Sequence, residues 1–284
     1  MATRIIDQND LIEATLRRVD LFAPWPAEVL IRMAAGSQLW RFAKGEALYE
    51  VGAPARGIFV LVDGSVIDGR TSSNGRIMAT SILRPGWPLG VRATWSGNSY
   101  GYTGTARSDL TAVLLPRAQF REAVLGDPKR LEALTDFFCT QIAQDMEGLR
   151  LRGLGSPRCV MAGYLAFLSR PTFHISADDP GAADPTAFDI TQDELAAMLF
   201  SARQTVNRLM KAMEREGVLR REGNRLRIVD FLKLLAVMEE DEPVHPAWRE
   251  QIVAWDARLK ALAAERPATT GKPAQWAPAS SPRA

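Results

Sequence analysis

The sequence contains little cysteine and little histidine. Its 284 residues include two cysteines, Cys139 and Cys159, and two histidines, His174 and His245. Two thiols are too few for a disulfide framework or for a cluster held by four thiolates, so we interpret both as small buried hydrophobic residues. Both histidines lie outside the β-strand pattern of the first half of the chain. We therefore expect no haem in that region and no metal site.

Long hydrophobic runs are also absent. No apolar stretch approaches the length that crosses a bilayer, and the first residues, MATRIIDQNDLIEATLRR, lack the hydrophobic segment of a secretion signal. We therefore expect a cytoplasmic protein with no membrane partner. The sequence has no P-loop, His-Glu-x-x-His helix or dinucleotide fingerprint, so we do not expect an enzyme. Apolar residues make up 46% and charged residues 24%, which is ordinary for a globular chain with room for two domains.

Two helix-start signals lie ten residues apart in the second half of the chain. Thr191 precedes Glu194 by three residues, and Ser201 precedes Gln204 by three, so each pair can form a capping box. Gly217 supplies a stop for the second helix. Two helices separated by so short a turn must cross sharply, which predicts a helix-turn-helix.

The start of the second helix exposes residue types that can read DNA bases. Arg203, Gln204, Asn207 and Arg208 share one face, with no acid among them. Arginine can grip guanine with two hydrogen bonds, and glutamine or asparagine can grip adenine. From Arg203 to Arg227, eight basic residues stand against three glutamates, a concentration typical of a nucleic-acid surface. The alternative is ordinary solvated charge on a helix and a hairpin.

The first half of the chain has the pattern of a β domain. Between Trp40 and Pro116, short alternating segments are separated by turn signals at Asp63-Gly64, Asn74-Gly75 and Pro85-Gly86. This pattern predicts a compact antiparallel β domain. Its corners are expected at Gly45, Gly52, Gly57, Gly64, Gly86 and Gly90. Residues 7–35, before it, predict short helices.

A long helix is predicted from about Asp127 to Arg152. Its apolar residues recur at spacings of three and four and form one stripe: Leu131, Leu134, Phe138, Ile142, Met146 and Leu149. Such a stripe can form one side of a helix–helix seam. Packing against the chain's own β domain is the alternative, and both can hold on different faces. The segment Gly153-Leu-Gly-Ser-Pro157 is predicted to break the helix and act as a hinge.

The segments that flank the two crossing helices complete a winged motif. Residues 158–170 predict another apolar helix, and residues 171–189, rich in proline, aspartate, alanine and glycine, predict a loop. Residues 218–229 predict a β-hairpin that turns at Gly223-Asn224. This hairpin would place arginines near DNA phosphates: Arg221, Arg225 or Arg227.

A glycine-cornered β roll, a long seam helix and the segment ITQDELAAMLFSARQTVNRLMKAMEREGVLRREGNRLRI together resemble the Crp/Fnr family of bacterial transcription factors. The resemblance spans residues 10–230 and is most specific from Ser201 to Leu209, because the family's recognition helix commonly shows Ser-Arg-Glu-Thr-Val-x-Arg. It implies an α+β fold with a cyclic-nucleotide-binding-like β roll (a double-stranded jelly roll), a dimerisation helix and a winged helix-turn-helix. With the C-terminal helices and a flexible tail, the expected ranges are 1–126, 127–153, 154–230, 231–265 and 266–284.

The resemblance also implies partners and site residues. It implies a homodimer that binds double-stranded DNA at an inverted repeat through the recognition helix 201–216, with RNA polymerase as a further partner. Arg203 and Arg208 take the places of base-reading arginines, and Gln204 stands where a glutamate is common. The expected DNA contacts are Ser201, Arg203, Gln204, Thr205, Asn207, Arg208, Lys211, Arg221, Arg225 and Arg227. The dimer seam is expected along the apolar stripe of 131–149.

The sequence departs from the family pattern in the turn and in the ligand pocket. Phe200 stands in the turn where many members have glycine, and a bulky residue with positive φ is strained there, so an adjusted turn is expected. Members that bind cyclic nucleotides have a Gly-Glu-Leu run for the ribose and an Arg-Ser/Thr pair for the phosphate. This chain has Gly86-Trp-Pro-Leu-Gly90 and Gly101-Tyr102 instead. A buried phosphate without a cation is unfavourable, so we expect no cyclic-nucleotide binding unless Arg92 substitutes.

Aromatic residues near these runs allow two interpretations. They line an apolar or aromatic effector site, or they pack in the core. The candidate effector pocket is Trp87, Leu89, Arg92, Trp95, Tyr100 and Tyr102. No cofactor is implied, and the identity of any effector and the choice between activation and repression stay open.

A C-terminal extension lies beyond the resemblance. Asp230 can cap a helix that an acidic break, Glu239-Glu-Asp-Glu-Pro243, ends. An apolar stripe follows on a second helix: Trp248, Ile252, Trp255, Leu259 and Leu262. Two tryptophans are too much apolar surface to leave in water, so we expect 246–264 to dock on this chain or on a partner subunit. The alternative is a free amphipathic helix that awaits another protein, while 266–284 is expected to stay mobile.

Two functions are compatible with these features. The first is a homodimeric DNA-binding transcription regulator. The second is a protein-interaction scaffold whose helix-turn-helix is vestigial. Salt-dependent DNA binding distinguishes them, because phosphate contacts impose a steep dependence on salt that a scaffold lacks.

Overall fold

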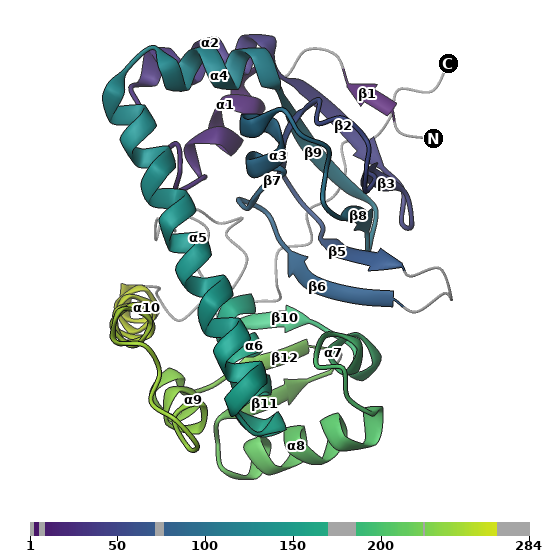
Figure 1. The fold of residues 1–284 in the computed structure, drawn as a ribbon, viewed down its shortest axis with the longest axis vertical. Coiled ribbons are helices and arrows are strands. Elements are labelled where there is room, and N and C mark those ends of the chain that lie inside the picture. The colour runs from purple at the N-terminus through teal and green to yellow at the C-terminus, as the bar shows by residue number, and fades with distance from the viewer. Residues whose placement is uncertain (1–2, 6–8, 72–76, 170–185, 224, 266–284) are drawn as a thin grey trace.

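The protein consists of two α+β bodies joined by a long helix (Figure 1). The structure is a computed structural model that describes residues 3–5, 9–71, 77–169, 186–223 and 225–265. The N-terminal body combines two sheets with short helices, and the C-terminal body combines helices with one small sheet. The predicted α+β class is confirmed. The expected tail at 266–284 lies outside the described residues.

The N-terminal body is built on an antiparallel β roll. One sheet has the order β1 (Thr3–Ile5), β2 (Gln38–Phe42), β9 (Leu110–Pro116), β4 (Gly57–Leu61), β7 (Pro88–Leu89). The other has the order β3 (Ala47–Tyr49), β8 (Thr103–Ala106), β5 (Val66–Thr71), β6 (Ile77–Leu83). Their pairs are antiparallel, as predicted. Strand β1 was not predicted from the sequence.

Strand β4 shows how the roll divides its core. All five of its residues are buried. Ile58 and Val60 join one apolar cluster, whereas Phe59 and Leu61 join another, because successive side chains of a strand point to opposite faces. The first cluster is covered by helices, and the second lies inside the roll. The covering helices are α1 (Asn9–Arg17), α2 (Ala27–Gly36), α3 (Val91–Ser96) and α4 (Arg117–Leu125).

At two of the predicted corner positions the structure explains why the residue must be glycine. At Gly57 an added Cβ would lie 2.2 Å from the carbonyl oxygen of Leu115, so the close strand pairing requires glycine. At Gly90 the φ angle is 80°, and an added Cβ would lie 2.7 Å from a ring carbon of Tyr100. Only glycine satisfies both the backbone conformation and the close contact.

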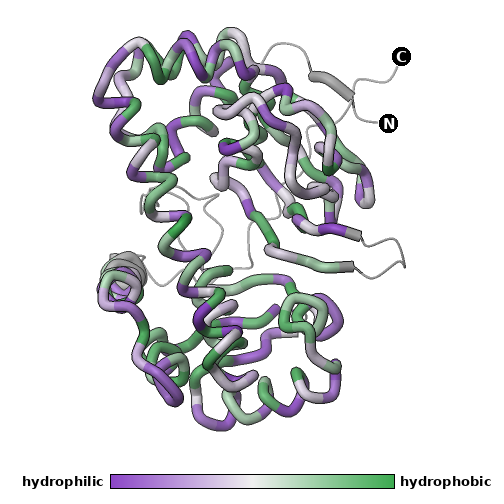
Figure 2. Tube along the Cα trace, viewed as in Figure 1, coloured by the Kyte–Doolittle hydropathy of each residue, from purple (hydrophilic) through white to green (hydrophobic). Residues whose placement is uncertain are grey.

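Helix α5 (Pro128–Leu154) connects the two bodies. Asp127 caps it by accepting a hydrogen bond from the Lys129 backbone, with proline in the first turn. Figure 2 shows both hydrophilic and hydrophobic residues along its length. Cys139 on this helix is exposed, so its interpretation as buried was wrong, whereas Cys159 is buried as expected. Cys159 lies in the core of the C-terminal body.

The C-terminal body begins with an apolar helix. Helix α6 (Pro157–Leu168) is capped by Ser156 and supplies Met161 and Leu165, which are fully buried. Helix α5 ends at Leu154 and α6 begins at Pro157, so the predicted helix break is confirmed, whereas the hinge stays a prediction. Most of the predicted loop at 171–189 lies outside the described residues. Its last residues form strand β10 (Ala187–Asp189) and not a loop, because they pair with the wing.

The helix-turn-helix and its wing follow. They comprise α7 (Gln192–Met198), α8 (Arg203–Arg215), β11 (Leu219–Glu222) and β12 (Arg225–Ile228). The sheet order β10-β12-β11 confirms the predicted hairpin and adds a third strand. Helix α8 lies at the end of the molecule that is farthest from α2 and α4 (Figure 1). Its buried face, Val206, Met210 and Met213, packs into the apolar cluster of this body.

The C-terminal extension docks on the same body. Asp230 caps α9 (Phe231–Met238), as predicted, and α10 (Pro246–Glu265) follows the acidic break. Trp248 is 5% exposed and Ile252 is fully buried, and both belong to the core cluster that contains α6 and α8. The expected docking on the chain itself is confirmed for this part of the stripe. The side chains of Leu259 and Leu262 lie outside the described residues.

Candidate DNA-binding interface

The turn between α7 and α8 differs in one detail from the prediction. Thr191 and Glu194 form the predicted capping box. The second box does not form, because the N-cap position of α8 falls on Ala202, one residue after Ser201, and has no side-chain hydrogen bond. Phe200 keeps the left-handed conformation, with φ of 49°, and its side chain is 61% exposed. The turn is thus not adjusted to the bulky residue, and it retains the strain of that backbone conformation.

The outer face of α8 presents cationic and amide groups to solvent. Arg203, Gln204, Arg208 and Lys211 are exposed. Ser201, Thr205 and Asn207, which were also predicted to contact DNA, are half-buried. The face is therefore polar opposite a buried apolar face, the arrangement that a helix needs to rest on a body and enter a groove.

Contacts with α7 hold two of these side chains. Arg203 lies 3.2 Å from Asp193 and 3.4 Å from the Gln192 oxygen, and the Gln192 amide donates to Asn207 at 3.1 Å. The Arg203 and Asp193 side chains are 65% and 68% exposed, so their ion pair contributes little stability and can be exchanged for another acceptor. The Asn207 oxygen is occupied by Gln192, which fixes its orientation before any base approaches.

The wing arginines are paired to different degrees. Arg221 lies 3.5 Å from Glu214, and Arg225 lies 3.5 Å from Asp189. Arg227 lies 2.8 Å from Glu222 and also donates to the Thr186 hydroxyl at 2.9 Å. Its side chain is 30% exposed, against 42% for Arg221 and 61% for Arg225. Arg227 is therefore the wing arginine most engaged within the protein.

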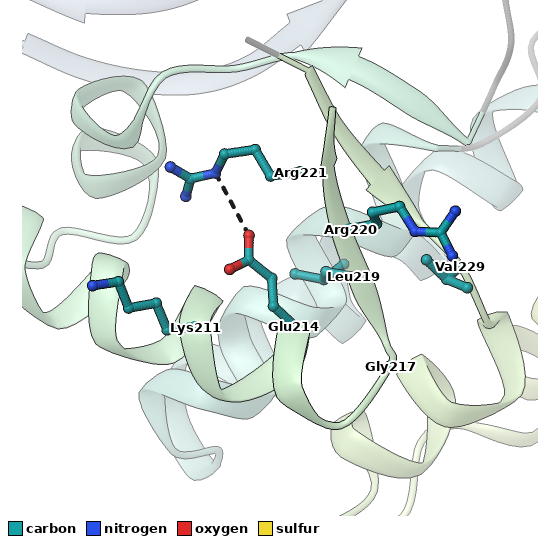
Figure 3. Close-up of a pocket in the computed structure, with 7 residues that line it drawn as sticks. All are labelled: Lys211, Glu214, Gly217, Leu219, Arg220, Arg221 and Val229. Carbon is teal, nitrogen blue, oxygen red and sulfur yellow. Dashed lines mark ion pairs between the residues drawn. The ribbon is translucent and has the colours of Figure 1, made fainter. Parts of the chain in front are cut away.

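A hollow of about 440 Å³ lies between the end of α8 and the wing. Figure 3 shows Arg221 reaching over the strand toward Glu214, with Lys211 on the same side, whereas Arg220 and Val229 lie on the other side of strand β11. Among the described residues, Arg208, Lys211 and Arg220 have no side-chain hydrogen bond or ion pair. These unpaired cations leave α8 and the wing positively charged at their exposed surface.

Two arginines of the β roll contact the C-terminal body, and sequence reasoning missed both. Arg107, between β8 and β9, donates two hydrogen bonds of 2.7 Å to Glu194, the capping-box residue of α7. Arg84 donates to the Leu168 and Ala187 carbonyl oxygens at 2.7 and 3.0 Å. Glu194 was recognised as a helix cap, but no local pattern indicated a partner 87 residues away.

The pKa of Glu194 reports this contact. Burial raises it, but hydrogen bonds from Arg107 and Thr191 more than offset burial, so the pKa of this carboxyl lies below its ordinary value. A lowered carboxyl pKa stabilises the folded state above the unfolded pKa, and this contribution is lost as the pH falls through the folded pKa. The contact therefore weakens in acid.

We expect a double-mutant cycle of Arg107→Ala and Glu194→Gln to give a coupling energy on the order of 2 kcal/mol, because both side chains are largely buried. Urea unfolding at pH 7 measures it, and the coupling should disappear near pH 3. The matched control is the Glu13–Arg17 pair on α1, which is more exposed and should give about 0.5 kcal/mol or less. Equal coupling for the two pairs would contradict the assignment.

The predicted effector residues do not converge on one cavity. Tyr100 and Leu89 are buried in the core of the roll, where the Tyr100 ring lies 4.6 Å from the Tyr49 ring and its hydroxyl donates to the Gly57 oxygen at 2.8 Å. Trp95 packs on the other apolar cluster. This part of the candidate pocket is therefore packed in the core, which is the second of the two interpretations that the sequence left open.

The remaining members of that set lie apart from one another. Trp87 lines a small cavity of about 30 Å³, and Tyr102 lines a larger one of about 360 Å³ at the far end of the roll. Arg92 is exposed and lines neither of these cavities. The core interpretation of the aromatic residues is thus right for Tyr100 and Trp95.

The predicted dimer seam is also divided. Ile142, Met146 and Leu149 are 60%, 56% and 61% exposed, as a free stripe requires. Leu134 is 1% exposed and packs in the core of the N-terminal body, so its place in the seam was wrong. Phe138 packs partly on the same core, and Leu131 is 40% exposed. The first turns of α5 pack on α4 and on the apolar cluster of the N-terminal body, which covers Leu134 and part of Phe138 and leaves Leu131 exposed.

Among the residues that the structure describes, no helix is long and apolar enough to span a bilayer. Within the same part, no group of three or more histidine, cysteine, aspartate or glutamate side chains is placed to hold a metal ion.

Comparisons with known proteins agree with this architecture. Residues 39–127 match the model of the cyclic nucleotide-binding domain, and residues 161–237 match that of the Crp-like helix-turn-helix domain. The second match runs past residue 230, where we expected the resemblance to end, and takes in most of α9. The chain is 22% identical over 224 residues to the CRP-like cAMP-activated global transcriptional regulator of Mycobacterium tuberculosis (strain CDC 1551 / Oshkosh), covering 78% of this chain and 98% of the relative.

Another relative and a solved structure extend the likeness. Transcriptional activator protein FnrL of Cereibacter sphaeroides is 27% identical over 201 residues, covering 69% of this chain and 76% of that protein. The structure of FixK2 from Bradyrhizobium japonicum has a TM-score of 0.59 at 19% identity and covers 71% of this chain and 96% of that one. The sensor-like β roll, the connecting helix and the winged helix-turn-helix therefore occur here in the family's order, and the chain belongs to the Crp/Fnr family of transcription regulators.

Proposed function

We propose that this transcription regulator reads an inverted-repeat DNA site with α8 and holds the flanking phosphates with its wing. The observation that carries the proposal is the exposed face of α8, where Arg208 and Lys211 have no side-chain partner among the described residues. Such cations lose no internal contact when they bind DNA. Arg203 exchanges a weak exposed ion pair for a base, while Arg221 and Arg225 approach the backbone.

Members of this family act as dimers, and we propose that the exposed part of the α5 stripe forms the seam. Ile142, Met146 and Leu149 supply it, with Leu131 at its N-terminal end. Pairing two copies through this stripe places two recognition helices on one side, so the half-sites lie about one helical turn apart.

The seam can be tested by Ile142→Asp. A charge in an apolar seam is unfavourable, so we expect the dimer to dissociate at least tenfold more readily, as measured by sedimentation equilibrium. The exposed position leaves the folded chain intact. The matched control is Ile31→Asp, because Ile31 is 51% exposed on α2 and away from α5. A dimer unchanged by Ile142→Asp would place the seam elsewhere.

We also propose that cyclic AMP and cyclic GMP are not effectors. The Tyr100 ring occupies the space beside Gly90, and it stacks on Tyr49 inside the roll. Both the ribose-binding glutamate and the phosphate-binding arginine pair of the family pattern are absent from the sequence. A nucleotide would have to displace a buried aromatic side chain and leave its phosphate unpaired.

Titration calorimetry with millimolar cyclic AMP or cyclic GMP should therefore show no saturable heat. Tyr100→Ala, which opens space beside Gly90, should not restore binding, because it supplies no cation for the phosphate. A micromolar dissociation constant for the unchanged protein would contradict the proposal and direct attention to Arg92.

The remaining assignments complete the proposal. The parts of the chain are a sensor-like body (1–126), a dimerisation helix (127–153), a DNA-binding body (154–230) and a helical extension (231–265) that shares the core of the DNA-binding body. The regulator acts in the cytoplasm, where it meets DNA and RNA polymerase, and it catalyses no reaction. Copurification of RNA polymerase with the DNA-bound protein tests that contact.

A further inference from the structure

The acidic break between α9 and α10, residues 239–242, contacts the junction between α5 and α6. The backbone N–H of Ser156, the N-cap residue of α6, donates a hydrogen bond of 2.6 Å to the Asp241 carboxylate. The Cys159 thiol, in the first turn of α6, donates to the same carboxylate at 3.0 Å. Ser156 comes two residues after Leu154, the last residue of α5. Asp241 therefore holds the chain where one helix ends and the next begins.

Arg158 links the same break to the recognition helix. It lies in the first turn of α6, and its Nε donates to the two carboxylate oxygens of Glu240 at 3.1 and 3.0 Å. Its other two nitrogens donate to Glu216, which follows the last residue of α8, one of them at 3.0 Å. A guanidinium can hold two carboxylates at once, because its donors form a planar fork. Arg158 therefore joins the break, α6 and the end of α8 at one corner.

Helix α9 holds the same end of α8. The Lys233 Nζ donates to the Glu216 carbonyl oxygen at 3.2 Å, and the last carbonyl groups of a helix have no partner within the helix itself. Met238, at the end of α9, belongs to one apolar cluster with Leu151 of α5 and Met213 of α8. The C-terminal extension thus contacts the end of the long helix and the end of the recognition helix through both polar and apolar groups.

The ion pairs at this corner are too exposed to add much to the stability of the fold. The Glu216 and Glu240 side chains are 47% and 44% exposed, against 19% for Arg158. Pairs that water reaches contribute little to the free energy of unfolding. A contact that forms in only one arrangement of two bodies nevertheless shifts the population toward that arrangement. The corner is therefore better suited to orient α8 than to stabilise the chain.

We propose that Asp241 and Arg158 are positioning residues for DNA recognition, which fix the orientation of α8 relative to α5. The inference rests on the proposed function, because it concerns the half-site spacing that a dimer joined through α5 reads. In such a dimer the separation of the two α8 helices depends on the angle between α5 and the DNA-binding body, so a corner that fixes this angle selects one spacing. Residues 239–242 lie beyond residue 237, where the match to the Crp-like helix-turn-helix domain ends, so the extension supplies this device.

The first test measures the junction itself, in the full-length protein without DNA. Asp241→Ala removes the acceptor of the Ser156 N–H, so this amide should exchange with deuterium about tenfold faster, as measured by mass spectrometry. Asp241→Asn keeps an oxygen acceptor without the charge and should retain most of the protection. Arg249→Ala is the matched control, because Arg249 pairs with Glu239 of the same break at 3.1 Å and its loss leaves the Ser156 contact in place.

The second test measures the half-site spacing that the protein reads. Inverted repeats whose half-sites are separated by one base pair more or less are compared by fluorescence anisotropy, and the unchanged protein should prefer one separation. In Arg158→Ala the preference for that separation should fall about threefold or more, because α8 is released from the junction. The melting temperature should stay within about 2 °C, since the lost ion pairs are exposed. Arg249→Ala should keep the preference.

Two results would overturn the proposal and leave the proposed function intact. The first is unchanged exchange of the Ser156 amide in Asp241→Ala, which would show that the break does not hold the junction. The second is an unchanged spacing preference in both Arg158→Ala and Asp241→Ala, which would show that the corner does not orient α8. If the unchanged protein itself prefers no spacing, the proposed function fails and the selection of a spacing fails with it, while the Ser156 exchange reports separately on the contact.

Discussion

Replacing Trp248 with alanine is expected to lower the free energy of unfolding by about 3–5 kcal/mol, as large-to-small changes of buried aromatic residues do. Trp248 is 5% exposed and belongs to the core cluster that also holds α6, α8 and α9. The substitution removes most of its contacts from a core that cannot fully collapse around the space. Urea unfolding followed by circular dichroism measures the change.

The same helix provides the control for this prediction. Val253 is 42% exposed, so Val253→Ala should change the free energy of unfolding by less than about 0.5 kcal/mol. Truncation after Glu242 removes Trp248 and Ile252 together and should lower the melting temperature further. An unchanged melting temperature after truncation would show that α10 contributes nothing to the stability of the chain.

Arg208→Ala is expected to weaken binding to a selected DNA site by about 1–3 kcal/mol and to relax specificity at one position in each half-site. Arg208 is exposed on α8 and has no internal side-chain partner among the described residues. Arg203→Ala should reduce specificity in the same way. Its loss of affinity should be somewhat smaller, because in the protein without DNA the Arg203 side chain already contacts Asp193 and must give up that ion pair to bind a base. Fluorescence anisotropy gives the affinity for the selected site and for random DNA, and the ratio of the two affinities gives the specificity.

Two comparison variants separate base reading from general charge. Arg221→Ala in the wing should weaken binding to selected and random DNA alike and lower the salt dependence, as expected for a phosphate contact. Arg32→Ala on α2 removes an exposed charge from the opposite end of the molecule and should change neither. Equal losses on selected and random DNA for Arg208→Ala would show that this arginine holds phosphates.

Local features of this fold could be predicted from the sequence, because their causes lie within a few residues. The Thr191–Glu194 capping box, the cap at Asp230 and the hairpin at Gly223 follow from short-range hydrogen bonds and backbone preferences. The polar outer face of α8 follows from helical periodicity. The Ser201 box failed within the same range, because a shift of one residue in the start of α8 moves the cap to Ala202.

Contacts between distant segments could not be predicted in this way. Leu134 and Ile142 belong to one stripe in the sequence, yet the β roll covers the first and leaves the second exposed. Tyr100 and Tyr102 are neighbours, but one fills the core of the roll and the other lines the cavity between the bodies. Leu134 and Ile142 lie on one helix, and Tyr100 and Tyr102 lie in the irregular segment before β8, so local geometry does not separate them. Only the packing of the whole chain decides which surface each side chain meets.

The sequence by itself determined the family, the antiparallel β domain, the long helix and the helix-turn-helix, since these depend on periodicity, capping and motif spacing. Only the tertiary structure shows that Arg107 forms a hydrogen-bonded ion pair with Glu194 and that Trp248 and Tyr164 line the same cavity. Each of these pairs is more than 80 residues apart, so its contact energy exists only after folding has brought the two distant segments together. The periodicity of the sequence predicts which face of a helix or strand is apolar, but only tertiary packing determines which other segment covers that face.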